Sequence, residues 1–593
     1  NGVILVTTKR GQSGKPSVAY QGLVGVTTAT NKPEFMESAE IAEKWNIARK
    51  SVGLDALYTD AEIQKFRDGS DPDNYANTDW TGLLYKNGMQ TSHNVTLSGG
   101  NEHAKYLASV GYLYQNGIIN NYDKNQVTAR VNVDINPSKY LETSWSINYI
   151  RSSVNEPEPS YNLSTSTGTY GGAFGSTNSV YQIIRQINVI NPMIPYKYSD
   201  GSYGRISDGN PIAWVESGAN GNNINSNLQG IGSIKVYFIP SVLSIKVAGS
   251  YTKKESEDAV HNLKVKYKAG TQGTTEVAYS TSNYERSVLD VTPEFKKAFG
   301  GHNVNVLLGY HAELFKYRYN WSYRTDMAND VVTDINAGAA STAKNDGYTR
   351  ELAMMSWFGR VAYDYKGRYL FEANARYDGS SRFAKANRWG FFPSLSAGWR
   401  ISDEAFFEGA KEVVSNMKLR ASWGKLGNQD LGSYYPTIST MSLGYGNIFG
   451  GSTYANGAKT VNAVNTNLKW EATTTWGIGL DANIWKFSTT IDWYEKTTNG
   501  ILMAVSTPST FALSSFYDNI GKVRNRGIEF DINYNDRFGQ VDFGAGINGS
   551  FNMNKVLDLG SDYASGNPIE YIGANIDQTS ARHVVGKAMN QFY

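Results

Sequence analysis

Residues 126–150 read QVTARVNVDINPSKYLETSWSINYI, with apolar and polar side chains alternating on both sides of a short turn. Before the turn, Val127, Val131 and Ile135 share one face, and Arg130 and Asp134 share the other. A period of two marks an extended strand whose two faces meet different surroundings. Two such runs joined by a few turn residues predict an antiparallel hairpin, with its turn at residues 136–139.

The same unit recurs along the chain, at residues 360–383, 475–496 and 526–552 among others. Roughly 17–18 strands of about ten residues can be marked, the length that a tilted membrane-spanning strand needs. Short helices are expected only inside loops, at residues 32–50, at 59–69 with Gly69 as the stop, and at 402–418.

The connections between these strands alternate in length. Short turns are predicted near residues 99–101, 136–139, 240–241, 300–301 and 366–367. Between them lie long loops, at residues 28–90, 151–227, 253–277, 318–349, 426–472 and 496–524. A soluble sandwich has no reason to place its short turns at one end and its long loops at the other. The pattern therefore predicts an all-β protein, a transmembrane antiparallel β-barrel.

Composition narrows the possible classes of protein. The 593 residues include 40 Tyr, 13 Trp and no Cys, and the formal net charge is +2. Without cysteine there is no disulfide framework and no thiolate metal site, and the charge does not indicate a nucleic-acid partner. No apolar run approaches the ~18 residues of a transmembrane helix. A β-barrel can nevertheless cross a membrane with the mean hydropathy of a soluble protein.

The sequence predicts no catalytic or metal-binding residues. The six His lack the H-E-x-x-H arrangement, no phosphate-binding glycine loop is present, and residues around Asp71 are expected to form a capped turn rather than a calcium loop. No cofactor is expected. The carboxylates on polar strand faces are expected to form cross-strand pairs with Arg130, Arg360, Arg376 and Arg420 in a wet interior; they are Asp134, Glu142, Asp364, Glu372, Asp481, Glu529 and Asp531.

The aromatic excess supports two interpretations. Most of it is expected to form interfacial girdles, with Trp145, Tyr149, Trp423 and Trp493 as members. A smaller set, predicted to lie in loops, are candidate substrate-binding residues that would stack on sugar rings: Tyr170, Tyr203, Trp214 and Trp321. The Tyr/Asn/Gly/Ser mixture of the loops suits an oligosaccharide or a peptide and does not choose between them.

Several stretches together resemble one family. They include NGVILVTTKRG (residues 1–11), TDWTGLLYKNGMQTSHNVTLSGG (78–100), RYDGSSRFAKANRWGFFPSLSAGWRISDEAFF (376–407) and MKLRASWGKLGNQDLG (417–432). The chain resembles TonB-dependent outer-membrane transporters in their starch-utilisation, SusC/RagA-like form.

The resemblance implies a domain organisation. Residues 1–11 would be the last strand of a plug domain, 12–16 a linker and 17–593 the barrel. Barrels of the family have 22 strands, of which roughly 18 would be present here. Residues 581–593 resemble an interior barrel strand, so two hairpins are expected after Tyr593, and most of the plug, with its TonB box, before Asn1.

The resemblance also implies a function. It is active import of oligomeric nutrients across the outer membrane of a Bacteroidota-type bacterium, with outer-membrane lipid around the barrel. The expected partners are TonB, which would act through the absent box, and a SusD-like surface lipoprotein. Glycan oligosaccharides are the expected cargo, with oligopeptides as the alternative. The alternative from a different class is a non-transporting surface β-protein that only binds glycans. Neither an enzyme nor a nucleic-acid binder is expected.

Overall fold

One antiparallel sheet of seventeen strands dominates the computed structural model, which describes residues 9–159, 179–206, 209–430, 432–449, 453–460, 463–506, 510, 513, 515–561, 569, 571–572 and 583–590. Each strand pairs with the next strand of the sheet along the chain, so the order is a simple meander. The strands are β1 Gly14–Thr27, β2 Gly88–Gly100, β3 Ala104–Asn116, β4 Asp123–Ser138, β5 Leu141–Pro157, β6 Asn220–Ile239, β7 Leu243–Asn262, β10 Glu276–Phe299, β11 His302–Thr325, β12 Lys344–Tyr365, β13 Tyr369–Ser380, β14 Trp389–Arg400, β15 Val414–Asn428, β18 Glu471–Ile484, β19 Phe487–Ser506, β20 Ser515–Phe538 and β21 Val541–Asp558.

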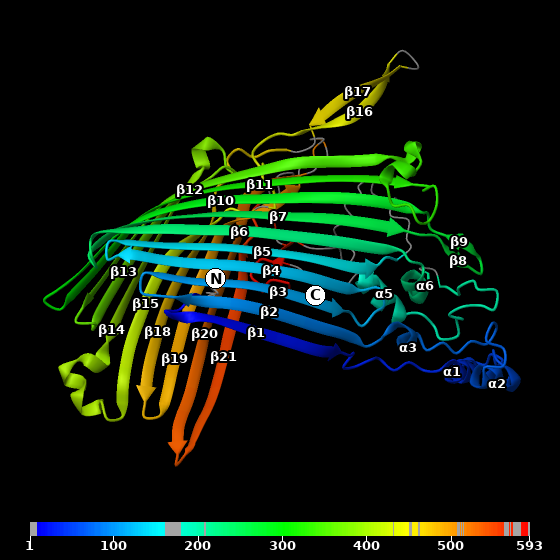
Figure 1. Cartoon of the computed structure of the whole chain (residues 1–593), viewed down its shortest axis with the longest axis horizontal. Coiled ribbons are helices and arrows are strands. Elements are labelled where there is room, and N and C mark those ends of the chain that lie inside the picture. The colour runs from blue at the N-terminus through cyan, green and yellow to red at the C-terminus, as the bar shows by residue number, and fades with distance from the viewer. Residues whose placement is uncertain are drawn as a thin grey trace.

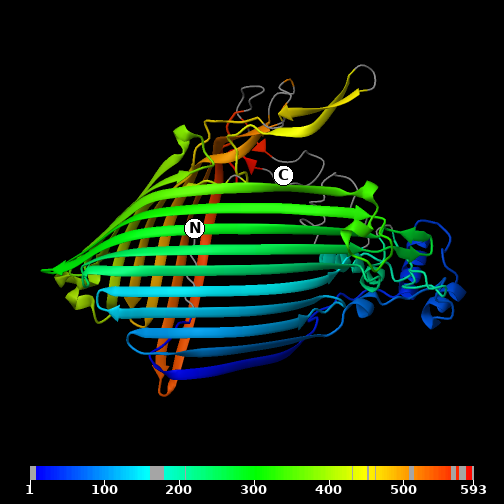
Figure 2. The same cartoon turned by 45° about the horizontal axis from the view of Figure 1, so that its top comes forward.

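The sheet curls into the wall of a barrel, with β1–β12 on one side and β13–β21 behind them (Figures 1 and 2). Three short hairpins lie outside the sheet: β8 Val265–Tyr267 with β9 Gly270–Gln272, β16 Met441–Phe449 with β17 Thr453–Thr460, and β22 Tyr571–Ile572 with β23 His583–Val584. The predicted all-β fold is confirmed. β1 begins at Gly14, inside the predicted linker, and residues 1–8 of the expected plug strand lie outside the described residues.

The predicted hairpin at residues 126–150 forms β4 and β5. Val131 lies opposite Ile147, while on the other face Asp134 lies opposite Ser144, whose hydroxyl donates to the carboxylate at 2.7 Å. The turn comes later than predicted, because β4 continues through an irregularity between Ile135 and Ser138. Pro137, which cannot donate a ladder hydrogen bond, sits at that irregularity.

Turn lengths at the two ends of the sheet differ as predicted. Tight turns join β10 to β11, β12 to β13, and β18 to β19, and the long connections lie at the opposite end. At Lys366–Gly367 both residues have positive φ, 54° and 67°, the hand that matches strand twist in a tight hairpin.

The outer face of the sheet is apolar and carries two belts of aromatic rings. Tyr369 and Tyr377 lie eight residues apart on β13, and Phe391 and Trp399 are spaced likewise on β14. Eight residues rise about 27 Å along a strand, or roughly 21 Å across a bilayer once a ~40° tilt is included. With the rings themselves, the belts frame an apolar band of about the height found in outer-membrane barrels. Trp145, Trp423 and Trp493, predicted as girdle members, line the same face.

Within the residues that the structure describes, helices are few and short. They are α1 Ser38–Ser51, α2 Asp60–Asp68, α3 Trp80–Leu84, α5 Ser179–Ile187 and α6 Pro211–Glu216. α2 begins and ends where expected, since Thr59 and Glu62 form a capping box and Gly69 adopts the left-handed conformation with φ of 64°. None of the described helices is long and apolar enough to cross a membrane.

Two predicted elements are wrong. The helix expected near residues 402–418 is replaced by 3-10 turns at Ile401–Asp403 and Ala405–Ala410, and β15 then begins at Val414. Residues 583–590 do not join the main sheet as the expected interior strand. Gly586 has φ of 86° and breaks the extended path, and the turn around it exchanges backbone hydrogen bonds with Val556 of β21.

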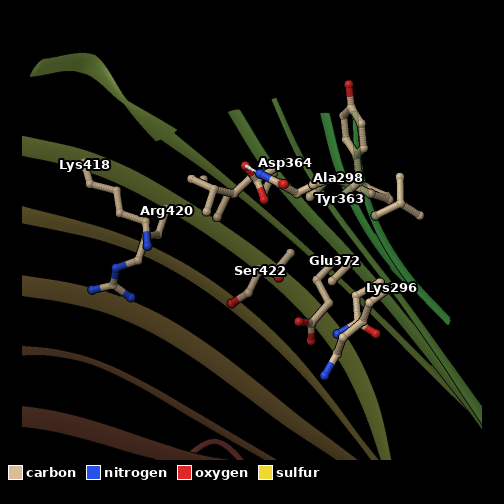
Figure 3. A pocket seen from close by; sticks show the side chains of 18 of the residues that line it. Lys296, Ala298, Tyr363, Asp364, Glu372, Lys418, Arg420 and Ser422 are labelled. Carbon is tan, nitrogen blue, oxygen red and sulfur yellow. Dashed lines mark hydrogen bonds between the residues drawn. The ribbon is translucent and has the colours of Figure 1, made fainter. Parts of the chain in front are cut away.

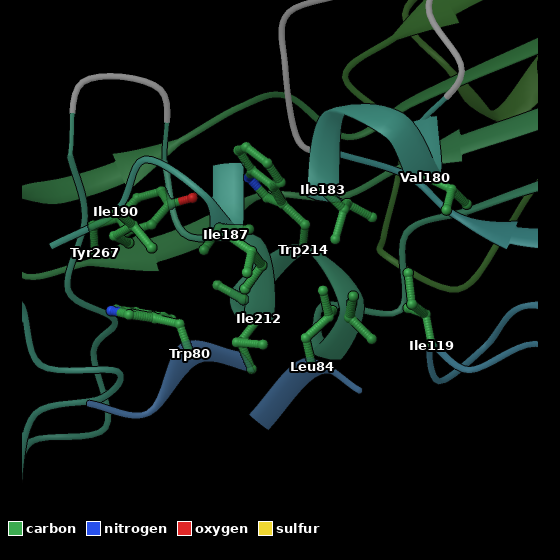
Figure 4. Close-up of a cluster of buried hydrophobic side chains, with 13 residues drawn as sticks. Trp80, Leu84, Ile119, Val180, Ile183, Ile187, Ile190, Ile212, Trp214 and Tyr267 are labelled. Atoms are coloured by element: carbon green, nitrogen blue, oxygen red, sulfur yellow. The ribbon is translucent and has the colours of Figure 1, made fainter. Parts of the chain in front are cut away.

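A compact apolar cluster ties four long loops together at the far end of the sheet (Figure 4). Trp80 and Leu84 come from the β1–β2 loop, Ile119 from the β3–β4 loop, α5 and α6 from the β5–β6 loop, and β8 from the β7–β10 loop. Trp214, on α6, has no accessible surface. The loops are also joined by backbone bonds, such as Lys86 N–H to the Ile118 carbonyl at 2.8 Å.

Placing the same charge on opposite faces of β19 tests the barrel assignment. Ile491 lies between Leu480 and Phe530 on the outer face, whereas Thr490 lies between Asp481 and Asp531 on the inner face. We expect Ile491→Lys to destabilise the folded protein by about 2–4 kcal/mol in bilayers, as lysine does at a lipid-facing position. Thr490→Lys, beside two carboxylates, should be nearly neutral. Urea titration of the reconstituted protein measures both, and equal effects would contradict the assignment of faces.

Truncation of the central indole tests the loop cluster. Trp214→Ala should cost about 3–5 kcal/mol locally, because it removes a fully buried ring. Limited proteolysis should then cut the β5–β6 loop faster while the heat-modifiable mobility of the barrel stays unchanged. Tyr181→Ala is the matched control, since that α5 side chain is 61% exposed. Parallel loss of barrel mobility would show that the cluster is not an independent unit.

Candidate functional site on the inner face of the sheet

The four aromatic residues predicted to bind substrate do not form one site. Tyr170 lies outside the described residues. Trp214 offers no stacking face, because its side chain forms the centre of the loop cluster. Tyr203 lies in the β5–β6 loop as expected. Trp321 belongs to β11 rather than to a loop, and its half-buried ring packs beside Tyr323.

Tyr203 is part of a small polar group at the rim. The hydroxyls of Tyr196 and Tyr203 both donate to the carboxylate of Glu216, at 2.5 and 2.8 Å, and the two rings meet edge to face at 5.9 Å. The ammonium of Lys197 lies 4.7 Å from the centre of the Tyr203 ring. Burial, and next the hydrogen bond to Glu216, raise the pKa of both phenols, so each remains a donor well above neutral pH.

A stripe of aromatic rings follows the inner face of β11. It occupies every second position from residue 315 to 323, where the sequence reads FKYRYNWSY. Its members are Phe315, Tyr317, Tyr319, Trp321 and Tyr323, and we call them the β11 stripe. The neighbouring Leu314 points the other way and is 64% exposed on the outer face. The stripe lies between the long loops and the aromatic belt that contains Tyr377 and Phe391.

Rings from adjacent segments widen the β11 stripe. Tyr284 of β10 meets Phe315 edge to face at 4.8 Å, and Tyr434 stacks on Phe315 at 5.5 Å with only 13° between the planes. Tyr348 of β12 lies 6.0 Å from Tyr317 and 5.5 Å from Tyr319. The result is an extended aromatic surface rather than a single binding pocket.

Cations flank the lower part of this surface. The guanidinium of Arg350 lies 4.2 Å from the Tyr348 ring centre and 5.5 Å from that of Tyr434. Arg382 lies 5.4 Å from the same Tyr434 ring and is held by Asp430 at 2.8 Å. Such contacts fix the rings and leave polar donors beside their faces.

The upper end of the stripe is locked to the wall. Tyr323 is buried, and its hydroxyl donates to the carboxylate of Glu276 at 2.6 Å. Asn262 also donates to Glu276, at 3.0 Å. Phe315 to Trp321 are half-buried, so their rings keep a face towards the interior.

Sequence reasoning found one member of the β11 stripe and missed the rest. The available signal was an aromatic side chain at five successive alternate positions, which places all five on one face of a strand. The loop predicted at residues 318–349 covers the second half of this run, so the prediction does not include the period. Tyr348 and Tyr434 carry no such local signal, because they join the surface only through tertiary packing.

At the turn end of the sheet, the inner face forms a cavity of about 920 Å³ whose lining includes several charged side chains (Figure 3). Lys418, Arg420 and Ser422 reach it from β15, Lys296 from β10, and Asp364 and Glu372 from β12 and β13.

The expected cross-strand pairing is confirmed for Arg420, which binds Asp481 at 2.8 Å and Asp492 at 3.1 Å. Arg376 instead binds Asp378 on its own strand. Within the described residues, no cluster of acidic or histidine side chains suits a metal ion. Near Asp71, the Asn74 amide donates to the carboxylate at 3.0 Å, as in a capped turn.

The first described residues lie against the inner face of β4 and β5. Arg10 binds Asp134 at 2.8 Å and donates to the Ser144 hydroxyl at 2.7 Å. The amide of Asn132 donates to the carbonyl of Lys9 at 3.0 Å. The partner of Asp134 is therefore Arg10, from a distant segment, and not a neighbouring-strand arginine such as Arg130.

Comparisons with known proteins agree with this architecture. The sequence model of the family described as TonB dependent receptor-like, beta-barrel matches residues 160–586. TonB-dependent receptor SusC of Bacteroides thetaiotaomicron is 29% identical over 633 aligned positions, which cover 100% of this chain and 58% of SusC. TonB-dependent receptor P3 of Formosa agariphila is 27% identical, with 94% and 53% covered. The chain thus spans little more than half the length of these curated relatives.

Solved structures share the fold. A structure of the RagAB peptide transporter superposes with a TM-score of 0.76 over 98% of this chain and 65% of that chain, at 18% identity. At that identity the likeness concerns the fold alone. The family match over most of the chain shows that the chain belongs to the TonB-dependent receptor-like β-barrel family of outer-membrane receptors, which are not enzymes.

Proposed function

We propose that the protein carrying this chain imports oligosaccharides across the outer membrane, with TonB as its source of energy and a SusD-like surface lipoprotein as its partner. The family membership supports a transporter of this type. The observation that carries the choice of cargo is the β11 stripe. It offers aromatic faces from Phe315 to Trp321, along about 20 Å of one strand, and pyranose rings present apolar C–H faces that stack on such surfaces.

The stripe suits an extended cargo for a geometric reason. Its rings follow one another at every second residue, about 7 Å apart along the strand, so an oligomer can move from ring to ring without losing all its contacts. Arg350 and Arg382, beside Tyr348 and Tyr434, supply donors for sugar hydroxyls. At the rim, Tyr203 with Glu216 offers a second polar and aromatic contact.

Gating is proposed to reside in a plug. Residues 1–11 are proposed as its final strand, 12–16 as a linker and 17–593 as barrel. The contacts of Lys9 and Arg10 with the inner face of β4 and β5 support this organisation. A barrel as wide as the family's 22-stranded form needs such a plug to keep the membrane tight. TonB would act on a plug segment that precedes these contacts.

Peptide cargo is the second candidate. It is favoured by the fold shared with the RagAB peptide transporter, and backbone amides could use the same rim carboxylate and guanidinium groups. The two candidates differ in their need for stacking, because a peptide of mixed sequence does not present a repeated apolar ring face.

Truncation of one ring in the β11 stripe tests the proposed cargo. Tyr319→Ala should weaken binding of the cognate oligosaccharide roughly fivefold to thirtyfold, corresponding to about 1–2 kcal/mol for one lost stacking contact. Tyr319→Phe keeps the ring and should bind almost as the unaltered protein does. Calorimetric titration of the full-length protein, purified in detergent with its lipoprotein, measures this over a panel of oligosaccharides and oligopeptides.

The outer face provides the matched control for that experiment. Arg318 is adjacent to Tyr319 but exposed on the opposite face of β11, so Arg318→Ala should leave affinity unchanged. Heat from oligopeptides alone would replace the proposed cargo with the peptide alternative. Equal binding by Tyr319→Ala and the unaltered protein would remove the β11 stripe from the substrate path. Saturable binding without TonB-dependent uptake by cells would favour a protein that only binds glycans.

A further inference from the structure

One connection at the turn end of the sheet breaks the rule of short turns. Residues 401–413 join β14 to β15, whereas residues 485–486 suffice between β18 and β19. Figure 1 shows this segment as a coil beyond the ends of β14 and β15. It contains the 3-10 turns Ile401–Asp403 and Ala405–Ala410, and we call it the turn-end coil.

A single carboxylate fixes the turn-end coil to the wall. Glu404 accepts hydrogen bonds from Arg368 at 2.8 Å, from the Tyr369 hydroxyl at 2.5 Å and from the Trp399 indole at 2.9 Å. Its residue is only 8% exposed. Three hydrogen bonds to this buried carboxylate hold the coil in one position, because leaving the carboxylate unpaired would be costly.

The turn-end coil lies on the outer side of the barrel. Trp399 lies opposite Tyr369 on one side and Leu419 on the other, and these side chains belong to the lipid-facing surface. Phe406 packs edge to face on Trp399, with ring centres 6.4 Å apart. Its own ring nevertheless remains 72% exposed.

The exposed apolar groups of the coil continue the aromatic belt at the turn end, which contains Tyr369 and Trp399. Val413 is 58% exposed and accepts a backbone hydrogen bond from Trp485, which is itself 69% exposed at the next turn. Through the Phe406–Trp399 contact, exposed apolar surface extends from the lipid-facing wall onto the coil. The lipid that covers the outer face of β14 and β15 therefore also contacts Phe406.

The charges of the coil do not favour binding to anionic lipid headgroups. Residues 401–413 hold four acidic side chains, at 403, 404, 408 and 412, against the single Lys411, a formal charge of −3. Lys411 is paired with Glu408 at 3.2 Å. Contact with a membrane must then come from apolar insertion alone.

Outer-membrane barrels place their short turns on the periplasmic side. We infer that the turn-end coil lies in the interface of the periplasmic leaflet, with Phe406 inserted among phospholipid acyl chains. Its ring would sit about 5–10 Å below the headgroup boundary, the depth of interfacial apolar side chains. The coil thereby fixes the height of the β14–β15 region in the bilayer. This inference is independent of the proposed cargo.

The absence of cysteine from the 593 residues makes the inference directly measurable. Phe406→Cys and Glu408→Cys are each introduced into the full-length protein, with any cysteine outside this stretch replaced by serine. Each variant is labelled with an environment-sensitive fluorophore and placed in phosphatidylcholine nanodiscs. We expect lipids with a nitroxide near the headgroup to quench the label at 406 strongly, and lipids with a deep nitroxide to quench it less. The label at 408, on a charged exposed position of the same turn, should be quenched far less by either.

Adding anionic lipid should not change these results, because the coil carries no excess positive charge. A quenching difference that appears only with anionic lipid would overturn the inference. So would equal quenching at 406 and 408, or a label at 406 that is accessible to a water-soluble quencher, which would instead indicate a surface for a periplasmic protein. Phe406 is exposed, so its replacement is not expected to impair folding, and the heat-modifiable mobility of each variant verifies this.

Discussion

The structure depends on the cost of an unpaired backbone amide or carbonyl in hydrocarbon. No water is available there to satisfy these groups, so each strand must find its partners in the strands beside it. The meander from β1 to β21 does this with nearest neighbours in sequence. Once the backbone is satisfied in this way, successive side chains point alternately to lipid and to water. Val131 opposite Ile147 on one face, and Asp134 opposite Ser144 on the other, are the local form of that constraint.

The same constraint explains how much of the fold could be predicted from sequence. Alternation is local, so the hairpin at residues 126–150 and the turn at Lys366–Gly367 were visible without any partner. What could not be predicted arises from tertiary contacts. Trp214 looks like any loop tryptophan in sequence, and only the packing of four loops makes it buried. Arg10 reaches Asp134 across more than a hundred residues, while the expected partners were on neighbouring strands. The 3-10 turns of the turn-end coil were not predicted, because its apolar residues also fit a short helix.

The candidate site could be predicted from the sequence only in part, for a different reason. The β11 stripe repeats an aromatic residue at every second position, and the alternation is as regular as that of any lipid-facing strand. Aromatic rings occur on both faces of this wall, however, and composition alone cannot assign a ring to the girdle or to the interior. The register of β10, β11 and β12 makes that assignment, because it places Phe315 and Glu313 on one face and Leu314 on the other.

The cluster around Trp214 has a consequence for how such a protein diversifies. Four loops share one buried core, so an insertion or a change of side-chain volume in one of them must be accommodated by the other three. Single loops are therefore poorly suited to independent exchange between relatives. Recombination that moves the four loops as a set preserves the packed core, whereas piecemeal drift erodes it. The rim of this barrel should accordingly evolve in steps, as an inherited module, while the exposed positions around it change freely.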